Sequence, residues 1–152
     1  MPNSTIRPAS PADAPAITRL VHDAYAPYIP RLGTRPGPML DDYAALVAAN
    51  AVWVLETAGT IAGVIVLHAE PDHLLVDNVA VAPSHAGHGL GRQLLEFAEA
   101  EARRLGLREL RLYTNVLMHE NIAMYARAGW TEYARGEQAG FSRVFVRKPV
   151  AL

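Results

Sequence analysis

The chain contains no cysteine among its 152 residues. It therefore has no disulfide framework, no thiolate nucleophile and no cysteine-based zinc site. Histidine is present, but its spacing is neither helical nor associated with cysteine, as the spacing of zinc ligands is. The histidines considered in this way are His68, His73, His85, His88 and His119. We therefore predict that the protein holds no metal ion.

A strong charge of one sign and a long apolar run are also missing. The chain has 14 Lys and Arg residues against 15 Asp and Glu residues, a formal net charge of −1 at pH 7. A chain with this balance of charge lacks the excess of basic residues that is typical of proteins that bind nucleic acid or an anionic membrane. No segment approaches the roughly 18 apolar residues of a membrane span, and residues 1–7 lack the apolar core of a secretory signal. We expect one cytoplasmic domain over residues 1–152, with no nucleic acid or membrane partner.

Glycine is concentrated in one stretch, where Gly87, Gly89 and Gly91 alternate with other residues. The preceding residues, 74–82, are typical of a strand, which Pro83 ends. The following residues are apolar at positions 90, 94, 95, 98, 102 and 105, the spacing of one buried helix face. Glycines allow the backbone to approach a ligand closely, and N–H groups at a helix N-terminus favour anions. The turn is therefore a candidate site for a phosphate or pyrophosphate.

Two familiar phosphate-binding motifs are excluded by the spacing. A Rossmann fingerprint needs a third glycine where Arg92 stands. A P-loop needs Gly-Lys-Ser/Thr, whereas Gly91 is followed by Arg92 and Gln93. The stretch resembles instead the acyl-CoA pyrophosphate loop of the GNAT N-acetyltransferase superfamily, Gln/Arg-x-x-Gly-x-Gly/Ala. Gly89 and Gly91 match its two glycine positions, and the chain departs from it at Ala86, where the family has Gln or Arg.

A second stretch, residues 120–130, resembles the other GNAT hallmark. That hallmark is a helix with Ala-x-x-Leu-Tyr, followed by a glycine–aromatic turn. Met124 stands at the leucine position, Tyr125 at the tyrosine and Trp130 at the aromatic position. The resemblance implies that Tyr125 lies near the thioester sulfur and protonates the departing thiolate. The alternative is that Tyr125 is a core aromatic residue on an amphipathic helix.

The resemblance implies acetyl-CoA as the acyl donor. Its acetyl and pantetheine groups are expected along the strand backbone around residues 79–81, and its pyrophosphate on the amides of residues 87–91. Arg92 either adds charge at the phosphates or is a solvated side chain. A common family asparagine, seven residues before the tyrosine, is Met118 here, which leaves two substitutes, Asn115 and Asn121. The expected cofactor-binding residues are Val79, Ala80, Val81, Ala86, Gly87, His88, Gly89, Leu90, Gly91, Arg92, Asn115, Asn121 and Tyr125.

Hydrophobic periodicity along the chain predicts the element order β-α-α-β-β-β-α-β-α-β, with a further short strand near residues 130–133. Ala58-Gly59 separates two strand patterns, which is a hairpin signature. The strands are expected at residues 5–7, 51–56, 60–67, 74–82, 108–114 and 141–147. Helices are expected from residue 10, from residue 41, from residue 90 and over residues 121–127. Antiparallel hairpins before a β-α-β-α run predict an α+β fold, with a mixed, mostly antiparallel sheet and helices on both faces. This is also the order of the GNAT fold.

Residues 25–39 contain four prolines and two glycines, which disfavour a regular helix or a central strand. The segment is either a surface loop with solvated arginines or a lid that faces the substrate. As a lid it offers aromatic and anion-binding groups, which would suit an amine that also bears a carboxylate. The candidate substrate contacts are Tyr25, Tyr28, Arg31 and Arg35.

Acyl transfer to an amine requires a base, because a free alkylammonium group has a pKa near 10.4. Asp77, on the strand before the glycine turn, is one candidate. His73 is another, because imidazole exchanges protons near neutral pH. Glu70, Asp72 and His119 are further alternatives, and so is a water relay to a distant base.

The resemblance therefore predicts an acetyl-CoA-dependent N-acetyltransferase. Its acceptor is expected to be a primary amine of a small molecule, an amino acid or a protein that attacks the thioester directly in a ternary complex. No covalent enzyme intermediate is needed, in agreement with the absence of cysteine. The alternative is a non-catalytic acyl-CoA-binding or sensing domain, motivated by Ala86 and the unassigned base. Domains of this family often form dimers, so a homodimer is compatible with the prediction.

Overall fold

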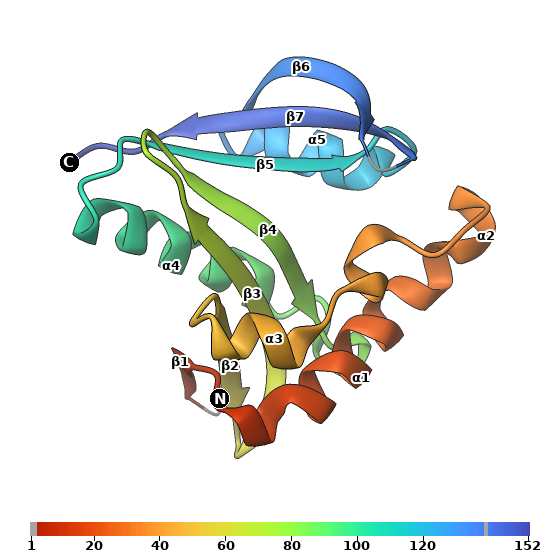
Figure 1. Ribbon diagram of the computed structural model, residues 1–152, viewed down its shortest axis with the longest axis vertical. Helices are drawn as coiled ribbons and strands as arrows, with labels where there is room; N and C mark the ends of the chain where they lie inside the picture. The colour runs from red at the N-terminus through yellow and green to blue at the C-terminus, as the bar shows by residue number, and fades with distance from the viewer. Residues whose placement is uncertain (1–2, 139) are drawn as a thin grey trace. The chain divides into compact units, whose positions relative to one another are not determined.

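The computed structural model of the chain describes residues 3–138 and 140–152. Its strands are β1 (Ser4–Pro8), β2 (Val52–Thr57), β3 (Thr60–Ala69), β4 (Leu74–Val81), β5 (Glu109–Asn115), β6 (Thr131–Gln138) and β7 (Phe141–Pro149). Its α-helices are α1 (Ala14–Tyr25), α2 (Ile29–Leu32), α3 (Tyr43–Ala48), α4 (Leu90–Arg104) and α5 (His119–Arg127). Figure 1 colours them from red at the N-terminus to blue at the C-terminus.

The strands pair in the order β1-β2-β3-β4-β5-β7-β6. β4 and β5 are parallel, while β1 with β2, β2 with β3, β5 with β7, and β6 with β7 are antiparallel. The predicted α+β class, with a mixed and mostly antiparallel sheet, is confirmed. The chain forms two compact units, one of residues up to 67 with residues 78–97, and one of residues 68–77 with residues 98–152. The expectation of one domain over residues 1–152 stays a prediction.

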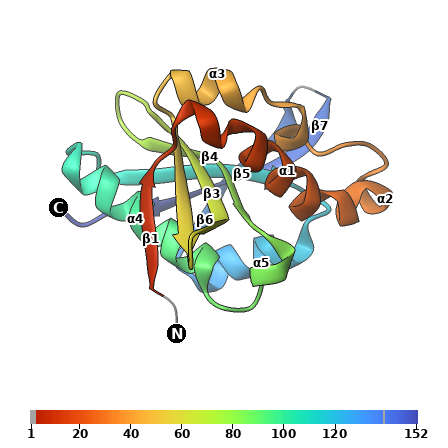
Figure 2. The ribbon, with the colours of Figure 1, turned by 90° about the horizontal axis from the view of Figure 1, so that it is seen from below.

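In the first unit, helices cover both faces of the strands. The buried side chains of α1 and α3 form a core with one face of β2, β3 and the end of β4. This core contains Ile17, Leu20, Val21, Tyr43, Val47, Val52, Val54, Val64, Val66 and Ala80. Because strand side chains alternate between faces, the neighbouring Trp53 points the other way, and its ring lies 5.7 Å from that of Phe97 on α4. Figure 2 shows α1 and α3 on one side of β2 and β3 and α4 on the other.

The predicted hairpin between β2 and β3 is confirmed, with Thr57 paired to Thr60 across the turn. Ala58 and Gly59 both have positive φ, 52° and 77°. This is the backbone of a two-residue hairpin turn whose twist matches that of the strands.

Residues 25–39 were expected to lack regular helix, and this is wrong in part. They contain two short 3₁₀ turns, η2 (Ala26–Tyr28) and the start of η3 (Gly37–Leu40), and the one-turn helix α2. Proline is tolerated in the first turn of a helix, because its missing N–H has no partner there anyway. Pro27, Pro30 and Pro38 each occupy such a first-turn position.

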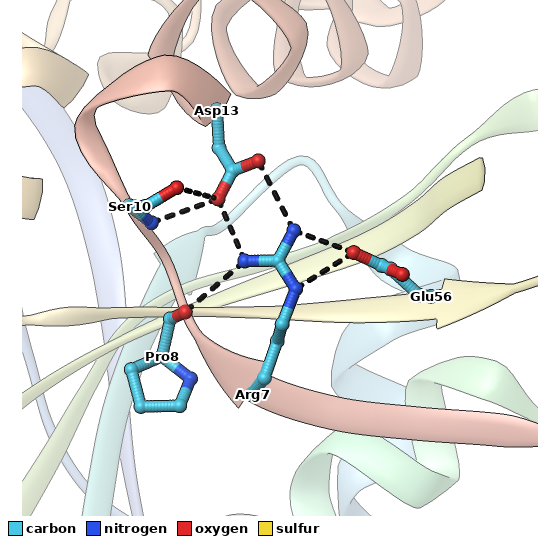
Figure 3. Close-up of polar contacts among 5 residues, drawn as sticks. All are labelled: Arg7, Pro8, Ser10, Asp13 and Glu56. Carbon is cyan, nitrogen blue, oxygen red and sulfur yellow. Dashed lines mark hydrogen bonds and ion pairs between the residues drawn. The ribbon is translucent and has the colours of Figure 1, made fainter. Parts of the chain in front are cut away.

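A cluster of polar side chains connects β1 to the 3₁₀ turn η1 (Pro11–Asp13), which precedes α1 (Figure 3). The Arg7 guanidinium donates to both carboxylate oxygens of Asp13, at 2.7 and 3.1 Å, and to Glu56 Oε1 at 2.7 Å. Asp13 also accepts from the Ser10 N–H at 2.8 Å and from the Ser10 hydroxyl at 3.0 Å. The Arg7 bonds therefore hold the pKa of the Asp13 carboxyl well below its usual range.

In the second unit, alternate residues of β5 and β7 are buried, so one face of this part of the sheet is covered. These residues are Leu110, Leu112, Val144 and Val146. Figure 1 shows α5 running behind β5 and β7. The helix α4 ends at Arg104, and Gly106 then has a positive φ of 74°, the conformation in which glycine commonly ends a helix. Leu105, expected on the buried face of that helix, lies beyond its end and is exposed.

The strand expected near residues 130–133 is longer than predicted. β6 spans eight residues, all of them exposed. Its sequence therefore has no apolar alternation to mark it, and the strand is held by pairing with β7.

Candidate active site

The glycine turn lies between β4 and α4, as predicted. After a short 3₁₀ turn, η4 (Pro83–His85), Gly87 and Gly89 adopt φ values of 82° and 77°. Side chains with a Cβ rarely adopt this conformation, so the backbone requires glycine at both positions. Gly91 differs, because it lies in the first turn of α4, and a Cβ there would meet only Val81 Cγ2, at 3.8 Å.

Six consecutive amide groups stand at this turn without a protein acceptor. The first hydrogen bond of α4 runs from the Gln93 N–H to the Gly89 carbonyl, at 3.1 Å. Among the residues that the structure describes, no N–H of residues 87–92 donates to a protein oxygen. Unpaired N–H groups at the positive end of a helix dipole bind anions. The turn therefore fits the diphosphate of coenzyme A.

The side chains around the turn are mostly exposed. The Ala86 N–H, expected to face the ligand, donates to the Pro83 carbonyl at 3.3 Å. His88 is exposed, and the Arg92 side chain is 84% exposed and paired with Glu96 at 3.1 Å. Exposed pairs of this kind are weak, so Arg92 is a solvated side chain that can turn toward a phosphate.

On the strand before the turn, the residues expected to lie along the thioester alternate between two environments. Ala80 is buried in the core, whereas Val79 and Val81 are half-buried. The Val79 carbonyl accepts from the hydroxyl of Tyr25, at 3.4 Å.

Tyr25, a predicted substrate contact, joins a buried polar cluster. Its hydroxyl donates to Asn78 Oδ1 at 2.8 Å, and Asn78 Nδ2 donates to the Tyr43 hydroxyl at 3.0 Å. The Tyr43 hydroxyl in turn donates to the Pro38 carbonyl at 2.6 Å. The cluster ties both ends of the segment of residues 25–43 to β4. Sequence reasoning missed Asn78 and Tyr43, although Asn78 is the one polar residue among the alternate, buried positions of β4.

The other candidate substrate contacts lie between these two tyrosines. The Arg31 guanidinium is 5.3 Å from the centroid of the Tyr28 ring, and Tyr28 is half-buried. Arg35 is exposed and follows Gly33, which ends α2 with a φ of 75°. The segment therefore presents cationic and aromatic groups from a backbone that is anchored at both ends.

Asp77, a predicted base, lies on the second unit's part of β4. Its Oδ1 accepts a short hydrogen bond from the Tyr113 hydroxyl, and its Oδ2 is 3.4 Å from His68 Nε2. The carboxylate is 19% exposed, so it keeps contact with solvent. Tyr113 and His68 were not predicted as its partners. Tyr113 lies 36 positions away on β5, and His68 lies on the neighbouring strand β3.

His73, the other predicted base, lies in the turn between β3 and β4. Its Nδ1 is 2.7 Å from Asp72 Oδ1, and this bond lowers the pKa of the Asp72 carboxyl. Arg111 lies 3.7 Å from the same carboxylate, and the Glu70 N–H closes the turn on the His73 carbonyl at 2.9 Å. His119 is exposed at the start of α5. Of the candidate bases, Asp77 contacts the Tyr113 hydroxyl, whereas His73 is bonded to Asp72.

Tyr125 is 6% exposed, and its ring meets that of Trp130 edge-on at 5.6 Å between centroids. Burial raises the pKa of Tyr125 to about 12, so its hydroxyl stays protonated at neutral pH. Among the described residues this hydroxyl has no hydrogen-bond partner, yet it is not an enclosed unsatisfied atom. Its oxygen therefore reaches the surface from a buried ring, as a proton donor to a ligand requires.

The two candidate asparagines differ in their surroundings. The Asn115 Oδ1 accepts from the Leu117 N–H at 2.9 Å and shapes the turn before α5. Asn121 is half-buried in the first turns of α5, and its side chain makes no hydrogen bond within the described part of the chain. Asn121 is therefore the more available of the two for a ligand.

Within residues 3–138 and 140–152, no group of three or more His, Asp or Glu side chains is placed to hold a metal ion. None of the helices described combines the length and the apolarity needed to cross a membrane.

Comparison with known proteins agrees with this geometry. The model of the "Acetyltransferase (GNAT) family" matches residues 17–130. The IAA acetyltransferase of Azospirillum brasilense is 32% identical over 135 residues, which is 87% of this chain and 87% of that protein. The PaiA N-acetyltransferase of Thermoplasma acidophilum, solved with coenzyme A, has a TM-score of 0.78 at 15% identity, over 97% of this chain and 99% of that one. The YncA protein of Salmonella typhimurium, solved with its cofactor acetyl-CoA, has a TM-score of 0.72 at 25% identity, over 99% of this chain and 95% of that one.

The matched region contains the glycine turn and the helix of Tyr125, the two stretches whose sequences resemble GNAT motifs. The predicted GNAT fold is confirmed by these similarities. The chain therefore belongs to the acetyltransferase (GNAT) family and is an acetyl-CoA-dependent acyltransferase.

Proposed function

We propose that the enzyme transfers the acetyl group of acetyl-CoA to a primary amine by direct attack in a ternary complex. The acceptor is a small molecule, an amino acid or a protein. The observation that supports this most is the run of six amides, residues 87–92, at the N-terminus of α4, which have no acceptor among the residues that the structure describes. In the proposed complex the diphosphate binds these amides, and the acetyl-bearing arm lies along β4 at residues 79–81.

Acetyl-CoA supplies the acetyl group as an activated thioester. Asp77 is the proposed base, which takes a proton from the ammonium group of the acceptor. The Tyr113 hydroxyl and His68 both contact the Asp77 carboxylate and fix its orientation. His73 is the alternative base, but its imidazole is already bonded to Asp72. A backbone N–H of a strand edge is the proposed donor to the oxyanion.

Tyr125 is the proposed general acid. Its hydroxyl is protonated at neutral pH because burial raises its pKa, and it gives that proton to the thiolate that leaves. The ammonium group loses one proton to Asp77 before it attacks the thioester. As a C–N bond replaces the C–S bond, Tyr125 gives its proton to the thiolate, and the second proton lost by the nitrogen restores the Tyr125 hydroxyl. Trp130 packs against the Tyr125 ring and holds it in position.

A CoA-release assay over a broad amine panel tests this function. Polyamines, amino acids and peptide N-termini are each offered with acetyl-CoA, and thermal unfolding is followed with and without CoA. We expect acetyl-CoA and CoA to raise the melting temperature and at least one class of amine to release CoA. Asp77→Asn is expected to abolish most turnover while the CoA-induced shift remains, whereas Asp23→Asn, at an exposed carboxylate on α1, changes neither. The absence of any shift with saturating CoA would contradict the proposal.

The family match and the named acetyltransferase relative give no support to a non-catalytic acyl-CoA-sensing domain. The proposal also includes a single domain, a cytoplasmic location and a homodimer. Sedimentation of the purified chain tests the homodimer directly.

A further inference from the structure

One face of β5 and β7 carries aromatic and cationic side chains. The register places Tyr113 opposite Phe145 and Asn115 opposite Arg143. The side chains that alternate with them are buried, including Leu112 and Val144. Because alternate strand residues point to opposite faces, the aromatic residues share the face away from this buried layer. The Tyr113 and Phe145 rings lie 6.2 Å apart and form a shelf on that face.

The Arg143 side chain packs against aromatic rings of this face and pairs with no carboxylate among the described residues. Its guanidinium carbon lies 4.2 Å from the centroid of the Tyr113 ring and 5.4 Å from that of Phe141. Within the described residues, the guanidinium makes one side-chain hydrogen bond, from Nη1 to Gln138 Oε1 at 2.7 Å. Within the described part of the chain, Arg143 has no ion pair, although Arg111 and Arg135 each have a glutamate. Stacking fixes the plane of the guanidinium and leaves most of its five N–H donors for a ligand.

The ring under Arg143 is also the ring that binds the proposed base. The Tyr113 hydroxyl donates to Asp77 Oδ1, while the face of the same ring carries the guanidinium. A cation and a carboxylate are thus held one aromatic ring apart, within one compact unit. A zwitterion with a carboxylate and an amine a few atoms apart complements this pair. The guanidinium fork matches a carboxylate in a bidentate manner, and Asp77 attracts and deprotonates the ammonium.

We propose that the acceptor is a primary amine that also bears a carboxylate, as an amino acid does, and that Arg143 binds this carboxylate. The inference rests on the proposed function, because it takes Asp77 as the base. It assigns the anion-binding role to Arg143, in addition to the arginines of the lid segment. Arg143 thereby determines which amines are accepted, while Asp77 acts on the amine itself.

The test compares amino acids with their decarboxylated partners. Three pairs are used: phenylalanine with phenethylamine, leucine with isoamylamine, and ornithine with putrescine. We expect kcat/KM for at least one amino acid to exceed that for its partner by more than tenfold. Arg143→Gln is expected to raise KM for the amino acid about 10- to 100-fold, the usual value of a hydrogen-bonded charge pair, so that the preference falls to near one. Arg143→Lys keeps the charge and loses the guanidinium fork. Its KM for the amino acid is expected to lie between the values of the wild type and of Arg143→Gln.

Arg147→Gln is the matched control. Arg147 lies on the same strand, stacks on Tyr133 at 5.6 Å and also has no ion pair among the described residues, but that ring does not contact Asp77. It is expected to keep the wild-type preference. A wild-type preference for the decarboxylated amines would overturn the proposal. An equal fall in kcat/KM for both members of a pair in Arg143→Gln would also overturn it.

Calorimetric binding to the CoA-bound enzyme separates this inference from the proposed function. If no amine is acetylated, the proposed function fails. Binding of an amino acid that is lost in Arg143→Gln would still support the role of Arg143. Failure of every amino acid in the panel to bind would overturn that role, even if other amines are acetylated.

Discussion

The hydroxyl of Tyr25 donates a 2.8 Å hydrogen bond to the Oδ1 of Asn78, a residue 53 positions away in the sequence. Asn78 is 4% exposed and also donates to Tyr43, so one amide group connects both ends of the segment of residues 25–43 to β4. Tyr25 is therefore a positioning residue as well as a candidate substrate contact. It orients the lid next to the strand residues that are proposed to lie along the thioester.

Asn78→Ala is expected to destabilise the protein by about 1–3 kcal/mol, because its hydrogen bonds to the Tyr25 and Tyr43 hydroxyls are lost. Tyr25→Phe removes one of these bonds and is expected to cost about 1 kcal/mol. Urea unfolding measures both values. KM for the acceptor should rise in both variants, while the affinity for CoA stays within a factor of three. Equal stability of Asn78→Ala and the wild type would show that the cluster does not hold the lid.

A second prediction concerns stability at low pH. Arg7 lowers the pKa of Asp13 in the folded state, while the unfolded state keeps a value near 3.9. A lowered pKa contributes stability that is present above the unfolded value and is lost as the pH falls further. Asp13→Asn should therefore cost about 1.5–3 kcal/mol at pH 7, and the difference from wild type should shrink below about pH 4.

Denaturant unfolding of the two proteins between pH 7 and pH 2.5 measures this difference. The exposed Asp23, which lies 3.5 Å from His22, supplies the control variant Asp23→Asn. It should stay within 0.5 kcal/mol of wild type throughout, as exposed changes usually do. A constant cost of Asp13→Asn across the whole range would show that the ion pair is not its source.

Local signals predicted most of the elements. Gly59 and Gly106 adopt the positive φ that their roles as hairpin turn and helix stop demand. The strand β6 was underestimated because none of its residues is buried, so pairing with β7 rather than hydrophobic alternation stabilises it. The short helical turns between residues 26 and 40 escaped prediction because their prolines occupy first-turn positions, where proline does not break a helix.

The glycine turn offers a sharper test of the diphosphate site. Gly91 has a helical backbone and open space around it, so Gly91→Ala should raise the free energy of unfolding by about 0.5 kcal/mol. The added methyl group would nevertheless stand beside the free amides and keep a phosphate away from them. We expect the affinity for CoA to fall at least tenfold although the apoprotein becomes more stable, as measured by calorimetry and thermal unfolding.

Gly89 and Gly106 provide a matched pair at the two ends of the same helix. Both have positive φ, 77° and 74°, and a Cβ at either would meet no atom within 4 Å. Alanine at each should therefore cost about 1–2 kcal/mol through backbone strain. Only Gly89→Ala should also weaken CoA binding. Equal CoA affinities in the two variants would exclude the turn as the diphosphate site.

The site was predictable in its sequence-local parts. The glycine turn and Tyr125 stand in contiguous motifs, so their spacing was visible in the chain. The partners of Asp77 were not visible. Tyr113 meets it through the parallel register that places Val76 beside Leu112. The register between two strands depends on the packing of the whole sheet, so a local sequence pattern does not predict it.

Tyr125→Phe tests the general acid directly. The substitution removes only the hydroxyl, so the packing against Trp130 and the stability should be retained. A general acid contributes roughly 10²- to 10⁴-fold to rate, so we expect kcat to fall about 100-fold or more, with the affinity for CoA changed less than threefold. Tyr133→Phe, at an exposed tyrosine of β6, is the control and should leave kcat unchanged. Because the pKa of Tyr125 is raised to about 12, the wild type should show no loss of kcat from this group up to about pH 10. A drop in CoA affinity that matches the drop in kcat would instead make Tyr125 a binding residue.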